Sequence, residues 1–398
     1  MTPNKNFESH WQLVANAVIA WLFAITGPFA ILLDIASKTQ LSQQYVASWI
    51  FGGYAIGGLL SIAMSYFFRQ PIGMAWTIPG ALLVAPALEH LSLPQAAGAY
   101  LVAGVIITLL GILGWVRKLM VYLPMPIVLG MVSGVFLPFG LKIITGFQDS
   151  FWIASVVVGA YFLASTVPVF GRAVPPVLAA LVAGIAAVVI GGAGVPTDPI
   201  GFALAQPSLI FPAFSMQAFL ELALPLVVTV VGIHNPQGIA VLAAAKYKPP
   251  VNALTVACGI GSLLAACVGA VPVCVTGPSN AIMCASGHMD QRYRSGMVYG
   301  FLMLLFGLAA PMAVAYGQVL PAAFIGVLAG LAIVRVLQGW MSTAFGSELS
   351  FGALVAFLVA LSDVSILNVG APFWGLVFGV AASWLTERAA LKKIWSSS

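Results

Sequence analysis

Charged side chains are scarce in this sequence. Only 6% of its 398 residues are Asp, Glu, Lys or Arg, whereas 61% are hydrophobic. Soluble domains average about 25% charged residues, so 15 basic and 10 acidic side chains cannot cover a water-facing surface of this size. The scarcity excludes a soluble globular enzyme, a nucleic-acid-binding domain and a disordered chain.

Motifs for catalysis and for metal binding are also missing. The sequence contains no HExxH, GxSxG or Walker motif and no pair of carboxylates at a useful spacing. Its four cysteines, at positions 258, 267, 274 and 284, form no CxxC pair and lie in apolar stretches. We interpret them as small buried packing residues rather than as a metal or redox site. The sequence predicts no enzymatic activity, no cofactor and no metal.

Long hydrophobic runs are what the sequence has instead. They extend unbroken for about 18–25 residues, the length that a helix needs to cross the hydrocarbon layer. The glycines follow no triplet period, which excludes collagen, and the runs do not alternate with polar residues, which excludes a β-barrel. The sequence therefore predicts an all-α polytopic membrane protein with about fourteen transmembrane segments. The predicted segments are 11–33, 44–67, 71–88, 94–114, 121–141, 151–169, 174–192, 214–244, 250–270, 271–286, 295–316, 318–338, 348–364 and 368–386.

The few charges support this count through their positions. A cytoplasmic N-terminus places thirteen basic residues on the inside and only Lys38 and Lys142 on the outside, a strong positive-inside bias. The thirteen are Lys5, Arg69, Arg117, Lys118, Arg172, Lys246, Lys248, Arg292, Arg294, Arg335, Arg388, Lys392 and Lys393. Five acids lie at predicted outer ends, namely Asp34, Glu89, Asp149, Asp198 and Asp363. Without the short third or tenth segment, every later loop would lie on the opposite side of the membrane and the charge bias would disappear. Both segments are therefore expected to cross the membrane or nearly so. Both termini are then cytoplasmic, the first segment is an uncleaved span, and a bacterial inner membrane is the expected location.

Two polar-x-Pro motifs occur in each half of the chain, in the same order and about 200 residues apart. Thr26–Pro28 and Thr77–Gly80 belong to the first half, and His234–Pro236 and Thr276–Asn280 belong to the second. An odd number of segments per repeat requires the second copy to be inverted, and interrupted helices at matching places indicate the binding site of a secondary transporter. The alternative is that proline is simply common in membrane helices. The two predicted repeats are residues 1–204 and 205–398.

The third and tenth segments are expected to combine a short strand with a half-helix. Each has an extended-looking run, 72–77 or 271–276, followed by a proline motif and a small-residue apolar stretch. Extended backbone survives in a membrane only where it is buried and paired. We therefore predict that the two strands hydrogen-bond to each other and that both half-helices begin beside one cavity.

Such a cavity suits an anion without any buried basic residue. Each helix N-terminus offers free N–H groups and about half a positive charge, so two of them approach one full charge. Donors from Thr77, Thr276, Ser279 and Asn280 would adjoin those termini. A carboxylate is the natural ligand, although a neutral amide ring would also fit, and Trp76 could wall an aromatic substrate.

Two titratable residues at depth are candidates for proton coupling. His234 adjoins the predicted break at Asn235–Pro236, and its ordinary pKa allows it to change charge in the physiological range. The alternative is a neutral histidine that hydrogen-bonds to a backbone group left without its helical partner by Pro236. Glu221 lies earlier in the same segment and could be either a proton carrier or an interfacial acid.

Three stretches of the chain resemble the benzoate:proton symporter (BenE-type) family. They are Ala75–Ala81, Ala223–Leu226 followed by Asn235–Ala240, and Ala371–Leu376. This family is similar in architecture to nucleobase–ascorbate and sulfate-type anion transporters, which have fourteen spans in two inverted sevens, divide into core and gate domains, and commonly form dimers. The chain departs from the family in having His234 where members often have Gln, in its Pro236–Gln237 order, and in the sequence Val275–Asn280.

The resemblance implies uptake of an aromatic carboxylate with a proton, between segments one, three, eight and ten. By matched motif it carries Thr77, Pro79, Gly80, Asn235 and Gly238 over as site positions. The full predicted substrate-binding set is Thr26, Pro28, Trp76, Thr77, Pro79, Gly80, Asn235, Gln237, Gly238, Thr276, Ser279 and Asn280. His234 and Glu221 are the predicted proton-coupling residues.

The sequence predicts a secondary active transporter that imports a small, benzoate-like aromatic carboxylate with protons by alternating access. Its partners would be that anion, protons, the lipid bilayer and a second copy in a homodimer, with no nucleic acid. A nucleobase or inorganic-anion transporter of the same fold is the alternative, although acids are absent from segment ten before Asp290, which disfavours a nucleobase. A passive channel is less favoured, because no continuous polar stripe is present.

Overall fold

The protein is described by a computed structural model in which residues 5–39, 41–116, 124–167, 176–192, 201–285, 287–362, 364, 366 and 371–396 are placed. Arg117, Lys118, Arg172, Asp198 and Asp363 of the predicted charge pattern lie outside these residues. The described part is predominantly helical, with one small sheet. Within these residues, every predicted segment contains helical structure.

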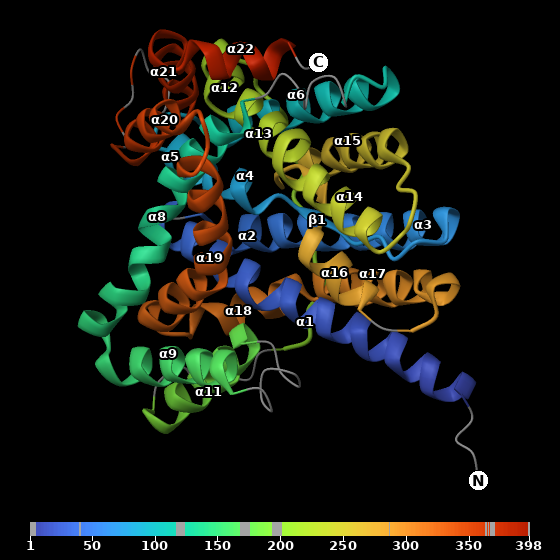
Figure 1. The fold of residues 1–398 in the computed structure, drawn as a ribbon. Helices are drawn as coiled ribbons and strands as arrows, with labels where there is room; N and C mark the ends of the chain where they lie inside the picture. Colours follow the sequence, from blue (N-terminus) through green and yellow to red (C-terminus); the bar gives the residue numbers. More distant parts are fainter. Residues whose placement is uncertain are drawn as a thin grey trace.

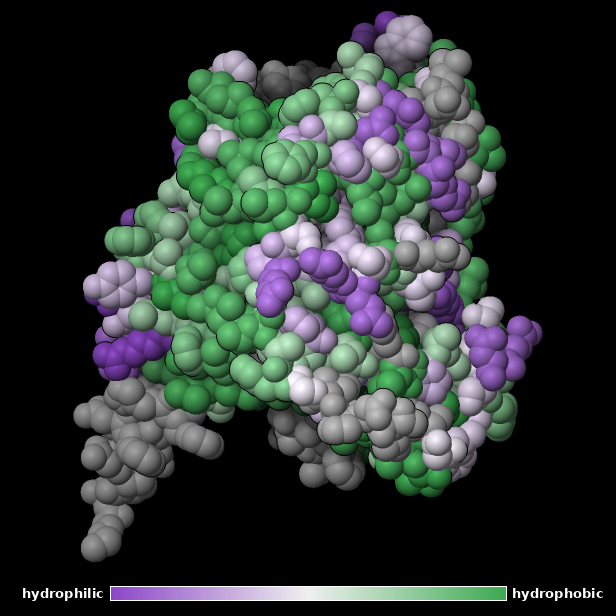
Figure 2. Space-filling model, turned by 180° about the vertical axis from the view of Figure 1, so that it is seen from behind, coloured by the Kyte–Doolittle hydropathy of each residue, from purple (hydrophilic) through white to green (hydrophobic). Residues whose placement is uncertain are grey.

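Several helices are long and apolar enough to cross a membrane. Within the described residues these are Gln12–Thr39, Gln43–Phe68, Leu93–Ile112, Met125–Asp149 and Met216–Ala244. Two bent pairs, Met289–Leu308 with Ala310–Gly317 and Ala322–Arg335 with Leu337–Phe345, raise the number of spans from 5 to as many as 7. Hydrophobic side chains also cover much of the face seen in Figure 2. The protein is an integral membrane protein.

The interruption predicted in segments one and eight is wrong. Helix α1 (Lys5–Thr39) runs through Pro28 without a break, and Met216–Ala244 forms one continuous span. That span consists of α12 (Met216–Ala218), η2 (Phe219–Ala223), α13 (Leu224–Val228), η3 (Thr229–His234) and α14 (Asn235–Ala244). Its two π-helical stretches each precede a proline, Pro225 or Pro236, in the first turn of the next α-helical stretch. A π-turn shifts the hydrogen bonding by one residue, which accommodates the missing proline N–H without breaking the helix.

Other predicted boundaries also shift. The segment predicted at 295–316 bends by 67° between α17 (Tyr293–Leu308) and α18 (Ala310–Gln318), where Pro311 starts the new helix. Helix α19 (Ala322–Phe345) continues past the predicted end at 338, and α8 (Met125–Asp149) continues past 141. The remaining elements are α2 (Gln43–Ile50), η1 (Phe51–Ile56), α3 (Gly57–Phe68), α6 (Leu93–Ile112), α9 (Phe151–Thr166), α11 (Pro176–Ile190), α15 (Val251–Cys267), η4 (Met289–Gln291), α20 (Ser350–Ser362), α21 (Ala371–Thr386) and α22 (Arg388–Ser396).

The two short segments contain the predicted strands. Strand β1 (Met74–Trp76) precedes α4 (Ile78–Leu82) and α5 (Val84–Ala87), and β2 (Val273–Val275) precedes α16 (Gly277–Cys284). The strands pair antiparallel with Ala75 opposite Cys274, and both are buried. The predicted strand pairing and the strand-plus-half-helix form of both segments are therefore confirmed. Strand β1 lies near the middle of the molecule in Figure 1.

Serine hydroxyls pair with backbone groups of the buried strands. Ser61 of α3 accepts from the Met74 N–H at 2.8 Å and donates to the carbonyl of Gly57, four residues earlier. Ser262 of α15 accepts from the Val273 N–H at 2.9 Å and donates to the carbonyl four residues before it. These bonds provide partners that the hydrocarbon layer cannot supply.

The helices pack as two groups. Helices α8, α9, α11, α19, α20 and α21 contact mainly one another and lie on the left of Figure 1. The other group contains both strands together with α1, α3, α6, α14, α15, α16 and α17. Contacts between the groups run through α1 with α19 and α11, through α4 with α8, and through η2 with α21. The two half-helices therefore begin close to the boundary between the groups.

Candidate functional site

A small central cavity lies at this boundary. Its volume is about 90 Å³, and it is lined by residues of α1, β1, α4, α8, α11, η3, α14, β2, α16 with its N-cap, and α19. Ligand pockets usually measure about 300–1,000 Å³, so this cavity is contracted. Separation of α8 and α19 from the strand-containing group would widen it.

Polar groups converge on one side of the cavity. The side chains that line it there are His234, Gln237, Thr276 and Ser279. Thr276 is the N-cap of α16 and donates its hydroxyl to the carbonyl of Gly73 at 3.2 Å. Ser279, in the first turn of α16, has its hydroxyl 3.5 Å from that of Tyr299. The start of α16 therefore brings a positive dipole end and two hydroxyls to the cavity, as predicted for an anion site.

His234 connects the cavity to the start of α4. Its Nδ1 lies 3.1 Å from the hydroxyl of Thr77, the N-cap of α4. That hydroxyl accepts from the Gly80 N–H at 3.2 Å and lies 3.4 Å from the hydroxyl of Thr229. Thr77 does not itself line the cavity. Its role is to link His234 with the N-terminal turn of the half-helix.

Aromatic and apolar groups form the remainder of the wall. Trp76 is buried and lines the cavity together with Phe23, Phe136 and Trp340. The rings of Phe136 and Trp340 pack edge to face with centroids 4.9 Å apart. No Asp, Glu, Lys or Arg is among the described residues that line the cavity. The wall therefore suits a flat apolar ring.

The two asparagines hold the backbone in place and do not line the cavity. Asn235 Oδ1 accepts from the Val275 N–H at 3.0 Å, and Asn280 Oδ1 accepts from the Gly73 N–H at 2.7 Å. Both side chains are fully buried. The predicted donor role of Asn280 is thus replaced in this structure by one of positioning the strands.

The other predicted residues divide between the wall and its support. Pro28 and Pro79 line the cavity. Thr26 is buried behind it, with its hydroxyl bonded to the carbonyl of Phe23. Gly80 packs against Thr77, and a Cβ at Gly238 would meet Val275 at 2.6 Å. Both glycines therefore permit close packing around the half-helices.

Glu221 lies away from the cavity. It is buried in η2, thirteen residues before His234 and so about 20 Å along the helix axis. Its carboxylate is 3.5 Å from the side-chain amide of Gln217. The structure does not bring the two proposed proton-coupling residues together.

Sequence reasoning missed the wall residues of the second helix group. Phe136 and Trp340 carry no motif, and Trp340 falls beyond the predicted end of its segment. All four cysteines are free thiols. The interpretation of all four as buried is wrong, because Cys267 is exposed. Within the described chain, no three His, Cys, Asp or Glu residues are grouped as a metal site would require.

A cavity between two groups of membrane helices, flanked by two half-helices, is typical of a membrane transporter. A family model described as "Benzoate membrane transport protein" matches residues 8–385, and the chain belongs to this family. It is a membrane transporter and not an enzyme.

Two relatives extend over nearly the whole chain. The "Benzoate membrane transport protein" of Acinetobacter baylyi is 29% identical, covering 96% of this chain and 97% of the relative. The "Inner membrane protein YdcO" of Escherichia coli is 31% identical, covering 91% of this chain and 92% of the relative.

Solved structures share the fold. The transmembrane domain of the cyanobacterial bicarbonate transporter BicA matches with a TM-score of 0.58 and 16% identity, covering 94% of this chain and 98% of that one. The murine anion transporter solute carrier 26 family member A9, in its inward-facing state, matches with a TM-score of 0.65 and 14% identity, covering 94% and 68%. At these identities the likeness shows the fold alone.

Proposed function

We propose that this protein is a secondary active transporter that imports a small aromatic carboxylate, such as benzoate, together with protons. The observation that carries the proposal is the central cavity, which combines an aromatic wall with a polar side free of charged residues among the described residues. The name of the Acinetobacter baylyi relative points to the same substrate class.

The two sides of the cavity match the two parts of the substrate. The ring packs between Trp76 of one helix group and Trp340 of the other. The carboxylate accepts hydrogen bonds from the Ser279 hydroxyl and from N–H groups in the first turn of α16, whose N-cap Thr276 already donates its own hydroxyl to the carbonyl of Gly73. Helix α4 contributes less charge than predicted, because it has only 5 residues and Thr77 already occupies the Gly80 N–H.

Proton coupling acts through the contact between His234 and Thr77. With His234 neutral, the Thr77 hydroxyl donates to Nδ1 at 3.1 Å. When Nδ1 gains a proton it becomes the donor, so the Thr77 hydroxyl turns its own proton toward the oxygen of Thr229, 3.4 Å away. The imidazolium adds a positive charge beside the cavity, which strengthens binding of a carboxylate. Glu221 remains a second candidate carrier at a separate place on the same helix.

Alternating access follows from movement of the two helix groups against each other. We assign the strand-containing group as the core and the group of α8, α9, α11, α19, α20 and α21 as the gate. The core then comprises segments one to four and eight to eleven of two inverted seven-segment repeats, residues 1–204 and 205–398. The equivalent bonds of Ser61 and Ser262 to the two strands support that repeat.

The orientation in the membrane, the cellular location and the oligomeric state are part of the same proposal. The positive-inside bias places both termini in the cytoplasm, and the name of the Escherichia coli relative points to an inner membrane. We assign a homodimer as the assembled state, in line with the architecture that the family resembles.

Substrate class is tested by uptake of radiolabelled benzoate into proteoliposomes with unlabelled competitors. Benzoate and other aromatic carboxylates are expected to compete, and uracil and bicarbonate are expected not to. Inorganic-anion transport is the second candidate, because the fold is shared with a bicarbonate transporter. Bicarbonate uptake without benzoate uptake would establish that alternative, and uracil uptake without benzoate uptake would establish a nucleobase transporter.

Trp76→Ala separates binding of the ring from binding of the carboxylate. Removing this wall residue is expected to raise the half-saturation concentration for benzoate about tenfold or more, from the loss of ring contacts worth about 1.5 kcal/mol. Phe67→Ala, a change at an exposed aromatic residue of α3, is the matched control. An unchanged affinity in Trp76→Ala would show that the substrate ring does not bind against Trp76.

A further inference from the structure

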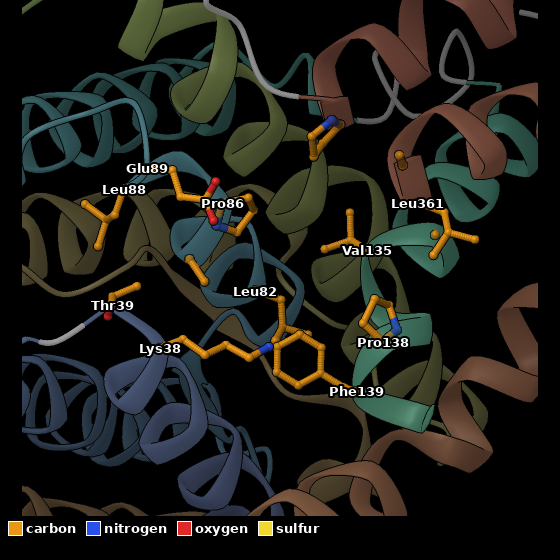
Figure 3. A pocket seen from close by; sticks show the side chains of 14 residues that line it. Lys38, Thr39, Leu82, Pro86, Leu88, Glu89, Val135, Pro138, Phe139 and Leu361 are labelled. Carbon is orange, nitrogen blue, oxygen red and sulfur yellow. The ribbon is translucent and has the colours of Figure 1, made fainter. Parts of the chain in front are cut away.

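A second and larger cavity lies beside the central one. Its volume is about 360 Å³, within the usual range for ligand pockets. It is bounded by the end of α1, by α4 and α5, and by α8, α20 and α21. Figure 3 shows Lys38 extended toward the ring of Phe139, with the carboxylate of Glu89 beside Pro86.

One end of this cavity carries positive charge next to an aromatic ring. The Lys38 ammonium lies 4.5 Å from the centroid of Phe139 and 3.6 Å from Asp34. The same Asp34 carboxylate also pairs with Lys142. One carboxylate therefore serves two ammonium groups, so the Lys38 charge is only partly compensated there. The Lys38 side chain is 42% exposed and accessible to a ligand.

The two cavities follow each other along α1 and α4. Ile31 of α1 lines the central cavity, and Lys38, seven residues or about 10 Å further along the helix, lines the second. On α4, Ile78 lines the central cavity, and Leu82, one turn later on the same face, lines the second. On α8, Phe136 lines the central cavity, and residues before and after it, Val135 and Phe139, line the second. The second cavity thus adjoins the first at the end that the charge pattern places outside.

We propose that the second cavity is an antechamber that binds the aromatic carboxylate before it enters the central cavity. This inference rests on the proposed function. The carboxylate pairs with the Lys38 ammonium, and the ring lies against Phe139 and the nearby prolines 86 and 138. Glu89, which lines the cavity beside Pro86, repels the anion and thereby directs it toward Lys38.

The test compares entry of substrate with its final affinity. Initial benzoate uptake by intact cells expressing the protein measures entry from the outer side only. Lys38→Gln is expected to raise the half-saturation concentration about threefold to tenfold at low ionic strength, with the maximal rate unchanged, because steering is lost. The equilibrium affinity of the purified protein for benzoate, followed by tryptophan fluorescence, is expected to stay within about twofold, since an antechamber changes entry and exit alike.

Matched variants separate charge from structure. Lys38→Arg should retain wild-type uptake, and Lys392→Gln, at an exposed lysine of α22, should have no effect. Glu89→Gln should lower the half-saturation concentration, and added salt should erase the differences among these charge variants. Phe139→Leu should raise the half-saturation concentration while the salt dependence stays as in wild type.

Two results overturn the antechamber. One is wild-type uptake kinetics in Lys38→Gln. The other is a fall in equilibrium affinity as large as the change in half-saturation, which would assign Lys38 to the central site. If the wild-type protein neither binds nor takes up benzoate, the proposed substrate itself is wrong and the antechamber for it is wrong as well.

Discussion

At the scale of residues, the contact between His234 and Thr77 would join substrate binding and proton binding in the proposed symporter. His234 lines the cavity and is also bonded to the N-cap of a half-helix. Any change in its protonation therefore reaches the substrate site electrostatically and α4 through a hydrogen bond. Thr229 gives the Thr77 hydroxyl a second acceptor at 3.4 Å, so the bond can reverse without leaving a buried donor unpaired.

His234→Ala should separate transport from coupling. We expect benzoate uptake driven by an imposed pH gradient to fall by about tenfold or more, because an alanine cannot carry the proton. Counterflow, in which labelled and unlabelled benzoate exchange, should persist within about threefold of wild type because it requires no net proton movement. Wild-type gradient-driven uptake in His234→Ala would exclude this residue as the carrier and leave Glu221→Gln as the next variant to measure.

Thr77→Val and Thr77→Ser form a matched pair. Valine keeps the shape but loses the hydroxyl that bonds His234 and the Gly80 N–H, whereas serine keeps it. We expect Thr77→Val to shift the pH dependence of uptake and Thr77→Ser to restore the wild-type profile. A valine variant that lowers the maximal rate without moving the profile would show that Thr77 acts only as a helix cap.

At the scale of elements, the paired strands determine where both half-helices begin. Much of this could be predicted, because prolines at 79 and 278 and β-branched residues before the second one are local signals. The continuity of the long helices could not be predicted in the same way. A proline signals a break from sequence alone, but π-helical turns before Pro225 and Pro236 remove the need for one.

The candidate site shows the same division. Residues beside the proline motifs, such as Trp76 and Thr276, were found because the motifs mark the half-helices. Phe136 and Trp340 come from helices with no motif, and only the packing of the two groups brings them to the cavity. Asn280 was assigned to the ligand because a sequence cannot distinguish an amide that faces a cavity from one that bonds a buried strand.

Ser61→Ala and Ser262→Ala test the equivalence of the two repeats at this scale. Each change leaves one strand N–H without its hydroxyl partner in a buried setting. Each should therefore cost about 1–3 kcal/mol of stability, by similar amounts. Thermal unfolding in detergent measures the loss, and Ser342→Ala, at an exposed position of α19, is the control. Two clearly unequal losses would contradict the equivalence of the two strand supports.

At the scale of the whole molecule, alternating access requires the two helix groups to move apart and together. At about 90 Å³ the central cavity is smaller than the usual ligand pocket, and its wall includes residues of both groups. Asp34 of α1 and Lys142 of α8 form an ion pair across the boundary. This pair offers a place where the relative movement can be stopped.

Asp34→Cys with Lys142→Cys, bridged by a reversible bifunctional thiol reagent, should stop uptake. Cys267 and Cys284 are replaced by serine beforehand, whereas the buried Cys258 and Cys274 can remain. Bridging should reduce uptake by at least about tenfold, and a reductant should restore it. Each single cysteine variant treated with the reagent is the control. Full uptake by protein shown to be bridged would contradict movement between the two groups.

Proton-coupled transport of an aromatic carboxylate is measured most directly by benzoate uptake into proteoliposomes under an imposed pH gradient. With the outside acidic, vesicles that contain the protein should accumulate labelled benzoate to a higher concentration inside than outside, and faster than protein-free vesicles. Protein-free vesicles measure entry of benzoic acid through the lipid, and a protonophore should abolish the accumulation. Protein-dependent uptake that is indifferent to the gradient would contradict symport, and the absence of any protein-dependent uptake would contradict the substrate.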